Sequence, residues 1–143
     1  MRRSALALVS ALGLFASSVG ASAQELRFNL DLIGSEDTKD GKCSLVFLAR
    51  NKLGIDIRNA LFEVTILDVS EQVKGTINLR LPAIASGKQR AVKYEFQVPC
   101  KQIASLLPGY FKECMGDKDS LDLCNAGLRM SSKIKIAFTD EAT

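Results

Sequence analysis

The sequence of 143 residues contains no histidine and no tryptophan, and only 6% of its residues are aromatic. Without histidine, a chain cannot form a Ser-His-Asp or Cys-His nucleophilic site, an HExxH zinc site or a histidine-ligated haem or copper centre. Without tryptophan, it has few side chains on which a sugar ring could stack. These absences exclude most hydrolases and metalloenzymes, and we expect a protein that is not an enzyme and uses no cofactor.

The carboxylates that are present have a simpler interpretation than catalysis. Glu63 and Glu95 could form the pair that glycoside hydrolysis needs, but each alternates with apolar residues and is expected on the outward face of a strand. Two acidic loops resemble Ca²⁺ ligand sets, yet the second has Leu121 where a third ligand should stand. We therefore expect solvated loops and no metal site. The acidic residues of these loops are Glu36, Asp37, Asp40, Asp117, Asp119 and Asp122.

Residues 1–23 have the pattern of a secretory signal peptide. A basic start, Met1-Arg2-Arg3, precedes the apolar run Ala5–Phe15 and the small-x-small segment Ala21-Ser22-Ala23. The apolar run is shorter than the roughly 20 residues that a membrane-spanning helix needs. We predict cleavage after Ala23, a single mature domain over 24–143 without a membrane anchor, and a periplasmic or secreted location.

Removal of this segment changes the charge balance. The whole chain carries 19 Lys and Arg against 16 Asp and Glu, a net charge of +3, and loss of Arg2 and Arg3 leaves 17 against 16, or +1. The remaining cations are spread along the sequence among acidic residues, with no basic stripe interleaved with aromatics. We therefore expect no nucleic-acid partner.

The four cysteines are an even set in a chain predicted to reach an oxidising compartment, which favours two disulfides. The preferred pairing joins Cys114 with Cys124 across a short loop and Cys43 with Cys100 across a long one. A bond from Cys100 to Cys114 or Cys124 is the main alternative, because these three lie in one C-terminal segment. The intervals contain no CxxC pair, so a four-thiolate zinc site is not expected.

Alternation of apolar and polar residues predicts short strands separated by turns about every ten residues. A short helix is expected over Cys100–Leu107, with Ile103, Leu106 and Leu107 on one face and Pro108-Gly109 at its end. This pattern predicts an all-β, antiparallel Ig-like β-sandwich of six or seven strands, with a short helix and a disulfide-stapled cap near the C-terminus. The expected strands include Glu25–Ile33, Cys43–Ala49, Ala60–Ile66, Ile77–Leu81, Val92–Val98 and Ile134–Phe138.

The position of the cap follows from the expected strand directions. If successive strands alternate in direction, Cys43 begins a strand at the end of the sandwich where the strand before Cys100 finishes. Cys114 and Cys124 would then lie above them. We therefore expect both disulfides at the same end of the domain.

The stretch from Cys43 to Val98 resembles small bacterial Ig-like sandwich domains of the FxLYD type. The resemblance depends on Asn51 at the end of a strand, the segment Asn59–Asp68, Gly75, and the Ser86-Gly87-Lys88 turn before a strand. The chain is also similar to exported bacterial proteins of unknown function that keep the later cysteines. The resemblance implies a sandwich fold and a role as a protein-interaction or accessory module. The segment after Pro99 has no counterpart in the generic module.

Two functions from different classes remain open. In the first, the protein is a non-catalytic interaction module that binds an envelope protein through a sheet edge or through the cap. In the second, it is a periplasmic protein that binds a small ligand or ion in a pocket beneath the cap. A long uncovered sheet edge would favour the first, and a pocket with convergent polar groups the second. Lys133 and Lys135 argue against the last strand as the open edge, because lysines hinder edge pairing.

Overall fold

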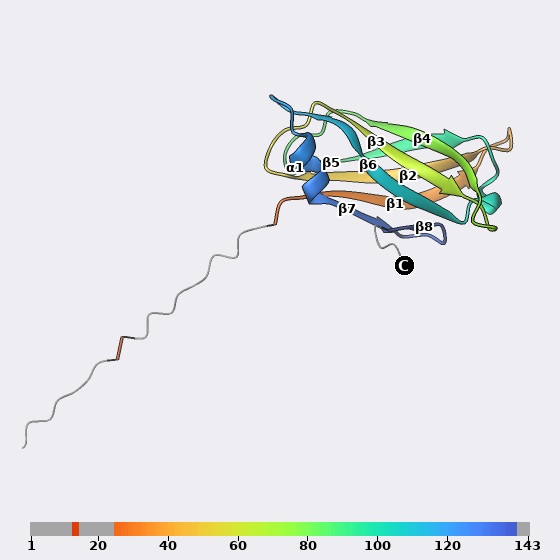
Figure 1. Cartoon of the computed structure of the whole chain (residues 1–143), viewed down its shortest axis with the longest axis horizontal. Helices are drawn as coiled ribbons and strands as arrows, with labels where there is room; N and C mark the ends of the chain where they lie inside the picture. The colour runs from red at the N-terminus through yellow and green to blue at the C-terminus, as the bar shows by residue number, and fades with distance from the viewer. Residues whose placement is uncertain (1–12, 15–24, 140–143) are drawn as a thin grey trace, which may run out of the picture.

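The computed structural model describes residues 13–14 and 25–139, so the predicted signal peptide lies outside the described residues apart from two positions. Within them, two sheets pack face to face (Figure 1). No helix in this part of the chain has the length and apolar character needed to cross a membrane. The elements are β1 (Arg27–Asp37), β2 (Cys43–Lys52), β3 (Asn59–Leu67), β4 (Val73–Leu81), β5 (Gln89–Phe96), the 3-10 helix η1 (Cys100–Gln102), β6 (Ser105–Met115), α1 (Leu121–Gly127), β7 (Leu128–Ser132) and β8 (Ala137–Phe138).

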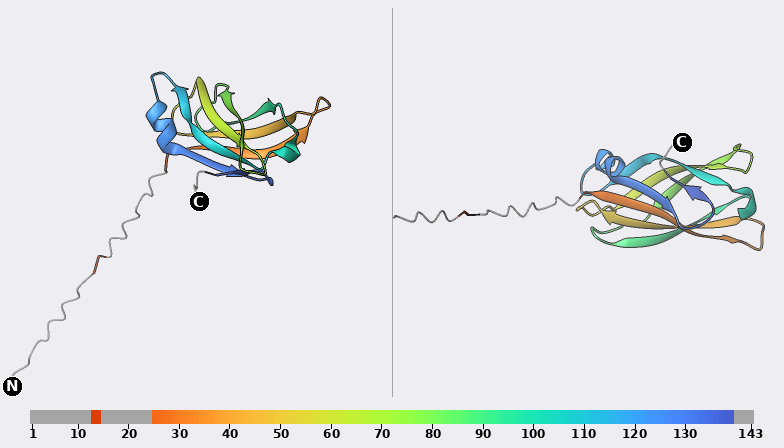
Figure 2. Two further views of the ribbon diagram at one scale, coloured as in Figure 1. Left: turned by 45° about the vertical axis from the view of Figure 1, so that its right-hand side comes forward. Right: turned by 90° about the horizontal axis from the view of Figure 1, so that it is seen from below.

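Each sheet has four strands, in the orders β5-β2-β1-β7 and β4-β3-β6-β8. We call these the first and the second sheet. Most neighbours are antiparallel, but β7 pairs with β1 and β8 pairs with β6 in parallel, so the sheets are mixed. The predicted β-sandwich with a short helix and two disulfides is confirmed, while both parallel pairs depart from a purely antiparallel arrangement. The two layers are seen from further sides in Figure 2.

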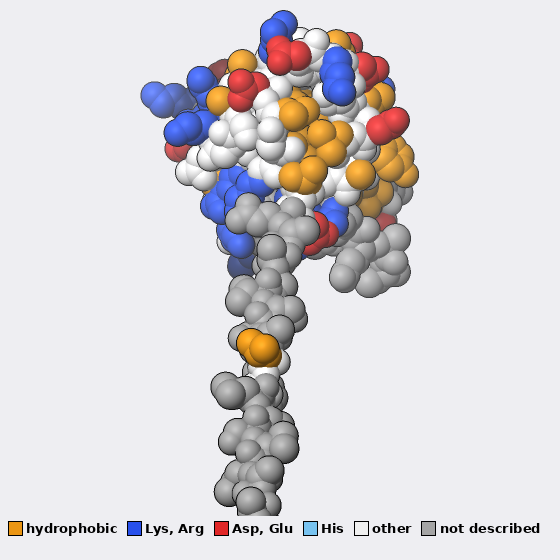
Figure 3. Space-filling view, turned by 90° about the vertical axis from the view of Figure 1, so that its left-hand side faces the viewer, with side chains coloured by type: hydrophobic (Ala, Val, Ile, Leu, Met, Phe, Trp, Pro, Cys, Tyr) orange, Lys and Arg blue, Asp and Glu red, His pale blue; other side chains and the backbone are white. Residues whose placement is uncertain are grey.

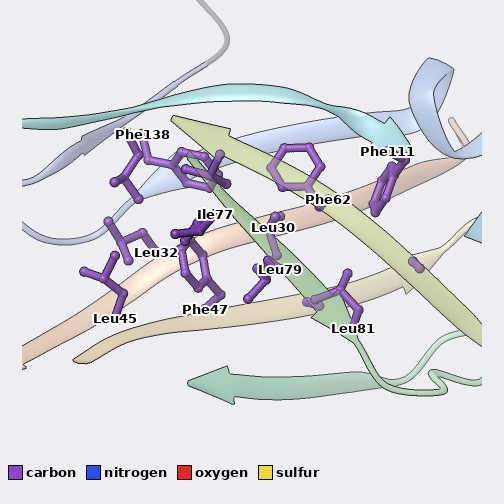
Figure 4. Packing of buried hydrophobic residues seen from close by; sticks show 14 of the residues in the cluster. Leu30, Leu32, Leu45, Phe47, Phe62, Ile77, Leu79, Leu81, Phe111 and Phe138 are labelled. Atoms are coloured by element: carbon purple, nitrogen blue, oxygen red, sulfur yellow. The ribbon is translucent and has the colours of Figure 1, made fainter. Parts of the chain in front are cut away.

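The core lies between the sheets and is built from the apolar row of each strand. Phe62 and Phe111 of the second sheet stack edge to face with ring centroids 5.3 Å apart. Phe111 also meets Phe28 of the first sheet at 5.0 Å, and Phe47 of the first sheet meets Phe138 at 5.7 Å. Edge-to-face contacts of this kind favour one packing arrangement over others. Figure 4 shows four of these rings among the leucines and Ile77 that complete the layer.

The helix predicted over Cys100–Leu107 is wrong. Only η1 is helical, and β6 begins at Ser105 and runs to Met115. Leu106 is buried and Leu107 exposed, as alternation in a strand requires. Pairing with β3 overrides the local pattern here, and Pro108 is accommodated because the register of the two strands shifts beside it. A helix is present later in the chain, at α1.

The two disulfides lie at opposite ends of the sandwich, so the expectation that both lie at the same end is wrong, while the short helix α1, which Cys114–Cys124 bonds to β6, is the stapled element predicted near the C-terminus. Cys43 begins β2 and bonds Cys100, whereas Cys114 pairs with Ala60 near the start of β3 and bonds Cys124 in α1. Because β2 runs directly into the connection to β3, the start of β3 is at the far end from Cys43. The physical reason is β6, whose eleven residues extend over about 36 Å and carry Cys114 along the whole domain.

Candidate functional site

Three of the six carboxylates of the acidic loops form contacts within the fold. Asp37 accepts a hydrogen bond from the backbone N–H of Cys100 at 2.8 Å. Asp117 forms an ion pair with Arg58 at 2.6 Å, and Asp119 accepts the N–H of Leu121 at 3.0 Å at the start of α1. Over residues 13–14 and 25–139, no group of three or more His, Cys, Asp or Glu side chains is placed to hold a metal ion. These carboxylates shape loops and helix ends.

Glu63 and Glu95 are not brought together. Glu63 lies on β3 in the second sheet and forms an ion pair with Lys112 at 2.5 Å. Glu95 lies on β5 in the first sheet, opposite Ser44 of β2. Both carboxylates stand on outward faces of different sheets, so they do not flank a common substrate.

The hollow nearest to the expected ligand pocket has few polar groups. It measures about 410 Å³ and lies beside η1, between Ile103 and Ile136. One serine hydroxyl and the ammonium groups of Lys101 and Lys135 are the side-chain polar groups in its lining. A pocket that selects a small ligand usually has several convergent polar groups, and this lining does not supply them.

A larger hollow of about 590 Å³ lies where β1 begins. Its carboxylate, Glu25, binds the guanidinium groups of Arg27 and Arg129, each with a contact of 3.1 Å. The hydrogen bond from Arg27, followed by its charge, lowers the pKa of Glu25. The charged groups of this hollow therefore already neutralise one another in part.

The end of the domain that carries α1 has an apolar surface. A hollow of about 520 Å³ there is lined by Ile55, Leu121 and Leu123 together with the polar residues at the start of α1. Figure 3 shows this end, with hydrophobic side chains gathered in the middle of the face. The three apolar side chains are half-buried and pack against the core, so they belong to the wall of the domain.

The feature that matches an interaction function is the edge strand β5. It pairs on one side with β2, and no other strand among the described residues pairs with its second side. The eight residues of β5 pair with β2 without a register shift. The other outer strands have a less regular or a shorter edge. The pairing of β4 with β3 contains a register shift, β7 has five residues, and β8 has two.

The register shows which backbone groups of β5 are free. The N–H of Asn51 donates to the carbonyl of Lys88 at 2.9 Å, and hydrogen-bonded pairs alternate along an antiparallel ladder. Val92 and Tyr94 therefore direct their backbone groups to β2. Ala91, Lys93 and Glu95 direct theirs to the free edge, and the side chains of these three are exposed. Lys93 is the one ammonium group among them.

Sequence reasoning missed a second feature, a group of cations on the outer face of the first sheet. Arg27, Arg50, Lys52 and Arg129 are far apart in the sequence, but the pairing of β1, β2 and β7 places them on neighbouring positions. Only the strand register contains this information. The statement that the cations are dispersed is correct for the sequence and wrong for the folded surface.

The chain is similar in structure to IrmA from Escherichia coli. The two match with a TM-score of 0.53 and 8% sequence identity, over 76% of this chain and 92% of that chain. No protein-family model matches the chain, and no curated protein matches it in sequence. At this identity the likeness shows the sandwich fold alone. The narrower resemblance to FxLYD-type domains stays a prediction.

Proposed function

We propose that this protein is a non-catalytic, exported interaction module of the cell envelope, which binds an extended segment of a protein partner along the free edge of β5. The observation that carries the proposal is the uncovered, regular edge of eight residues. A partner strand would add to the sheet through main-chain hydrogen bonds, which give affinity, while the alternating side chains give specificity. In this proposal the chain is FxLYD-like and residues 1–23 direct export.

The location in the envelope is supported by the two disulfides, Cys43–Cys100 and Cys114–Cys124. Disulfides persist in oxidising compartments such as the periplasm and the exterior of the cell. A soluble module there could also expose a sheet edge to a partner, provided that the edge is not prone to self-aggregation. The charged residues of β5, which are Arg90, Lys93 and Glu95, limit such aggregation.

The test uses a proline substitution that removes one N–H donor from the free side of β5 and none that pairs with β2. Ala91→Pro deletes an N–H that points away from β2, and proline is tolerated in edge strands at such positions. Ala91→Val keeps that N–H at the same position and serves as the matched control. The tagged protein, expressed with its own N-terminal segment, is cross-linked in intact cells, and captured proteins are quantified by mass spectrometry.

We expect one stoichiometric partner with the wild type and the Ala91→Val control, and at least a tenfold loss of that partner with Ala91→Pro. Circular dichroism and the urea midpoint of each variant establish that the fold is kept. A partner captured equally by all three proteins would rule out the β5 edge as the binding site. The absence of any enriched partner, when unrelated envelope complexes survive the procedure, would contradict the interaction function itself.

A further inference from the structure

The outer face of the first sheet has a basic end. Arg27 lies opposite Lys52, and Arg50 and Arg129 flank the next outward residue of β1 on its two sides. Glu25 is the carboxylate that pairs with this group, through Arg27 and Arg129. Arg50 has no ion-pair partner among the described residues, and its buried Nε has no hydrogen-bond acceptor there. This end therefore carries an excess of positive charge.

The opposite end of the same face is acidic. Glu36 of β1 and Glu95 of β5 lie on the two sides of Ser44 in β2. Both glutamates are exposed, and neither forms an ion pair with a cation of the described residues. Ser44 separates the two carboxylates, so both are open to solvent on one outward row. A positive group on another molecule could therefore pair with them.

Between the two ends the face is more apolar. Val46 and Leu48 of β2 are half-buried, and Ala91 lies opposite Leu48 on β5. Asp31 is occupied by a hydrogen bond from Ser131 at 2.6 Å, and Lys93 stands opposite Val46 at the margin of the sheet. The face thus runs from basic through apolar to acidic along the strand direction.

We propose that this face binds a second copy of the chain. A two-fold axis that lies in the interface and runs perpendicular to the strands would bring the basic end of each copy onto the acidic end of the other. Arg50 of one copy would then face the row that contains Glu36 and Glu95 of the second, and Leu48 would meet Val46. A two-fold interface needs one surface that is complementary to itself, and this charge order provides it.

The size of the face suits a weak contact. Three strands of about eight residues and the five residues of β7, spaced about 4.8 Å apart with about 3.3 Å per residue, give about 450 Å² per copy, or about 900 Å² in total. Weak and transient interfaces bury areas of this order. The expected product is a dimer that dissociates on dilution and in high salt, because its ion pairs lie near the surface.

Sedimentation velocity of the purified protein over a wide concentration range tests this proposal. Arg50→Glu, and separately Glu36→Arg with Glu95→Arg, should raise the dimer Kd about tenfold or more, because each dimer contains every changed contact twice. The triple variant that combines all three changes should restore the dimer. Arg80→Glu, an exposed arginine on the second sheet, is the matched control and should leave Kd unchanged.

A monomer at all concentrations, or a dimer that resists both charge reversals, would overturn the proposal. Glu36 and Glu95 are exposed, whereas Arg50 is half-buried. If Arg50→Glu fails to fold, the double variant Glu36→Arg with Glu95→Arg decides the outcome. The proposal is independent of partner capture at β5. Arg50→Glu leaves every backbone group of that edge in place, so loss of the dimer with retained capture would separate the two surfaces.

Discussion

Asn51 is the fully buried polar side chain at the end of β2, and it holds the connection to β3. Its amide donates to the carbonyls of Ile55 and Ile84 at 2.7 and 2.9 Å and accepts the N–H of Leu53 at 3.1 Å. Asn51→Ala removes these bonds inside the domain and should lower the free energy of unfolding by about 2 to 3 kcal/mol. Lys52→Ala, at the exposed neighbour, should change it by less than about 0.5 kcal/mol. Equal urea midpoints for the two variants would refute this role of Asn51.

Asp68 makes stability depend on pH at the turn between β3 and β4. The backbone N–H groups of Gln72 and Ser70, bonded at 3.0 and 2.8 Å, and the ammonium group of Lys74 hold its pKa below 3.8. Because the folded-state pKa is the lower one, this stabilisation is complete above pH 3.8 and is lost as the pH falls through the folded value. Asp68→Asn should therefore cost stability at pH 7 and progressively less as the pH falls below 3.8, as measured by urea unfolding. Asp40→Asn, at an exposed loop position, is the matched control for the change of a carboxylate to an amide.

At this scale the sequence was informative about which side chains face the core. Leu30, Phe62 and Ile77 are buried as their alternation with polar residues predicted. The pattern did not reveal that the amide of Asn51 would be enclosed, since its partners Ile55 and Ile84 come from two different connections. The residue types and the period of their alternation indicate which face of a strand is buried. The hydrogen-bond partners of a side chain depend on chain segments that only the fold brings together.

Within β5, two neighbouring prolines should have very different effects. Val92→Pro removes an N–H that pairs with β2 and should destabilise the domain by about 1 to 3 kcal/mol, because the carbonyl that accepted this hydrogen bond is left unpaired. Ala91→Pro removes an N–H on the free side and should keep the fold. Thermal melts followed by circular dichroism distinguish the two. A larger destabilisation by Ala91→Pro than by Val92→Pro would mean that the assigned pairing of β5 with β2 is out by one residue.

The bounds of the strands with strict alternation of apolar and polar residues were predicted within a few residues. The elements of the C-terminal third of the chain were not. Ile103, Leu106 and Leu107 suit a helix face as well as a strand, and Pro108 was read as a helix end. The open edge of β3 decided between these alternatives by pairing with β6. The last strand is shorter than the predicted Ile134–Phe138, because β8 pairs with β6 at Ala137 and Phe138 alone.

For the molecule as a whole, the two disulfides cross-link opposite ends of the domain and should contribute unequally to the free energy of unfolding. Cys43–Cys100 closes a sequence separation of 57 residues and Cys114–Cys124 one of 10. Loss of loop-closure entropy in the unfolded chain gives about 4 and about 3 kcal/mol respectively. Replacing the cysteines pairwise by alanine should therefore lower the urea midpoint more for the first pair. The reverse order would show that native packing around α1 outweighs the unfolded-state effect.

The preferred cysteine pairing was correct, while the predicted position of the second pair was wrong. Cys114 was expected near Cys43 because the intervening segment was taken as a compact cap. The length of β6 reverses that placement. The cations of the first sheet were missed for a related reason, since Arg27 and Arg129 are neighbours only through the parallel pairing of β1 with β7. Long-range pairing of this kind leaves no periodic signal in a single sequence.

Amide hydrogen exchange along β5, measured by NMR on the protein without a partner, tests the central claim most directly. An open edge predicts slow exchange for Val92 and Tyr94, whose N–H groups pair with β2, and fast exchange for Ala91, Lys93 and Glu95. Binding of a second copy through the outer face would leave this alternation unchanged. Uniformly slow exchange across these five residues would show that the edge is already covered, and it would contradict the proposal that β5 awaits a partner strand.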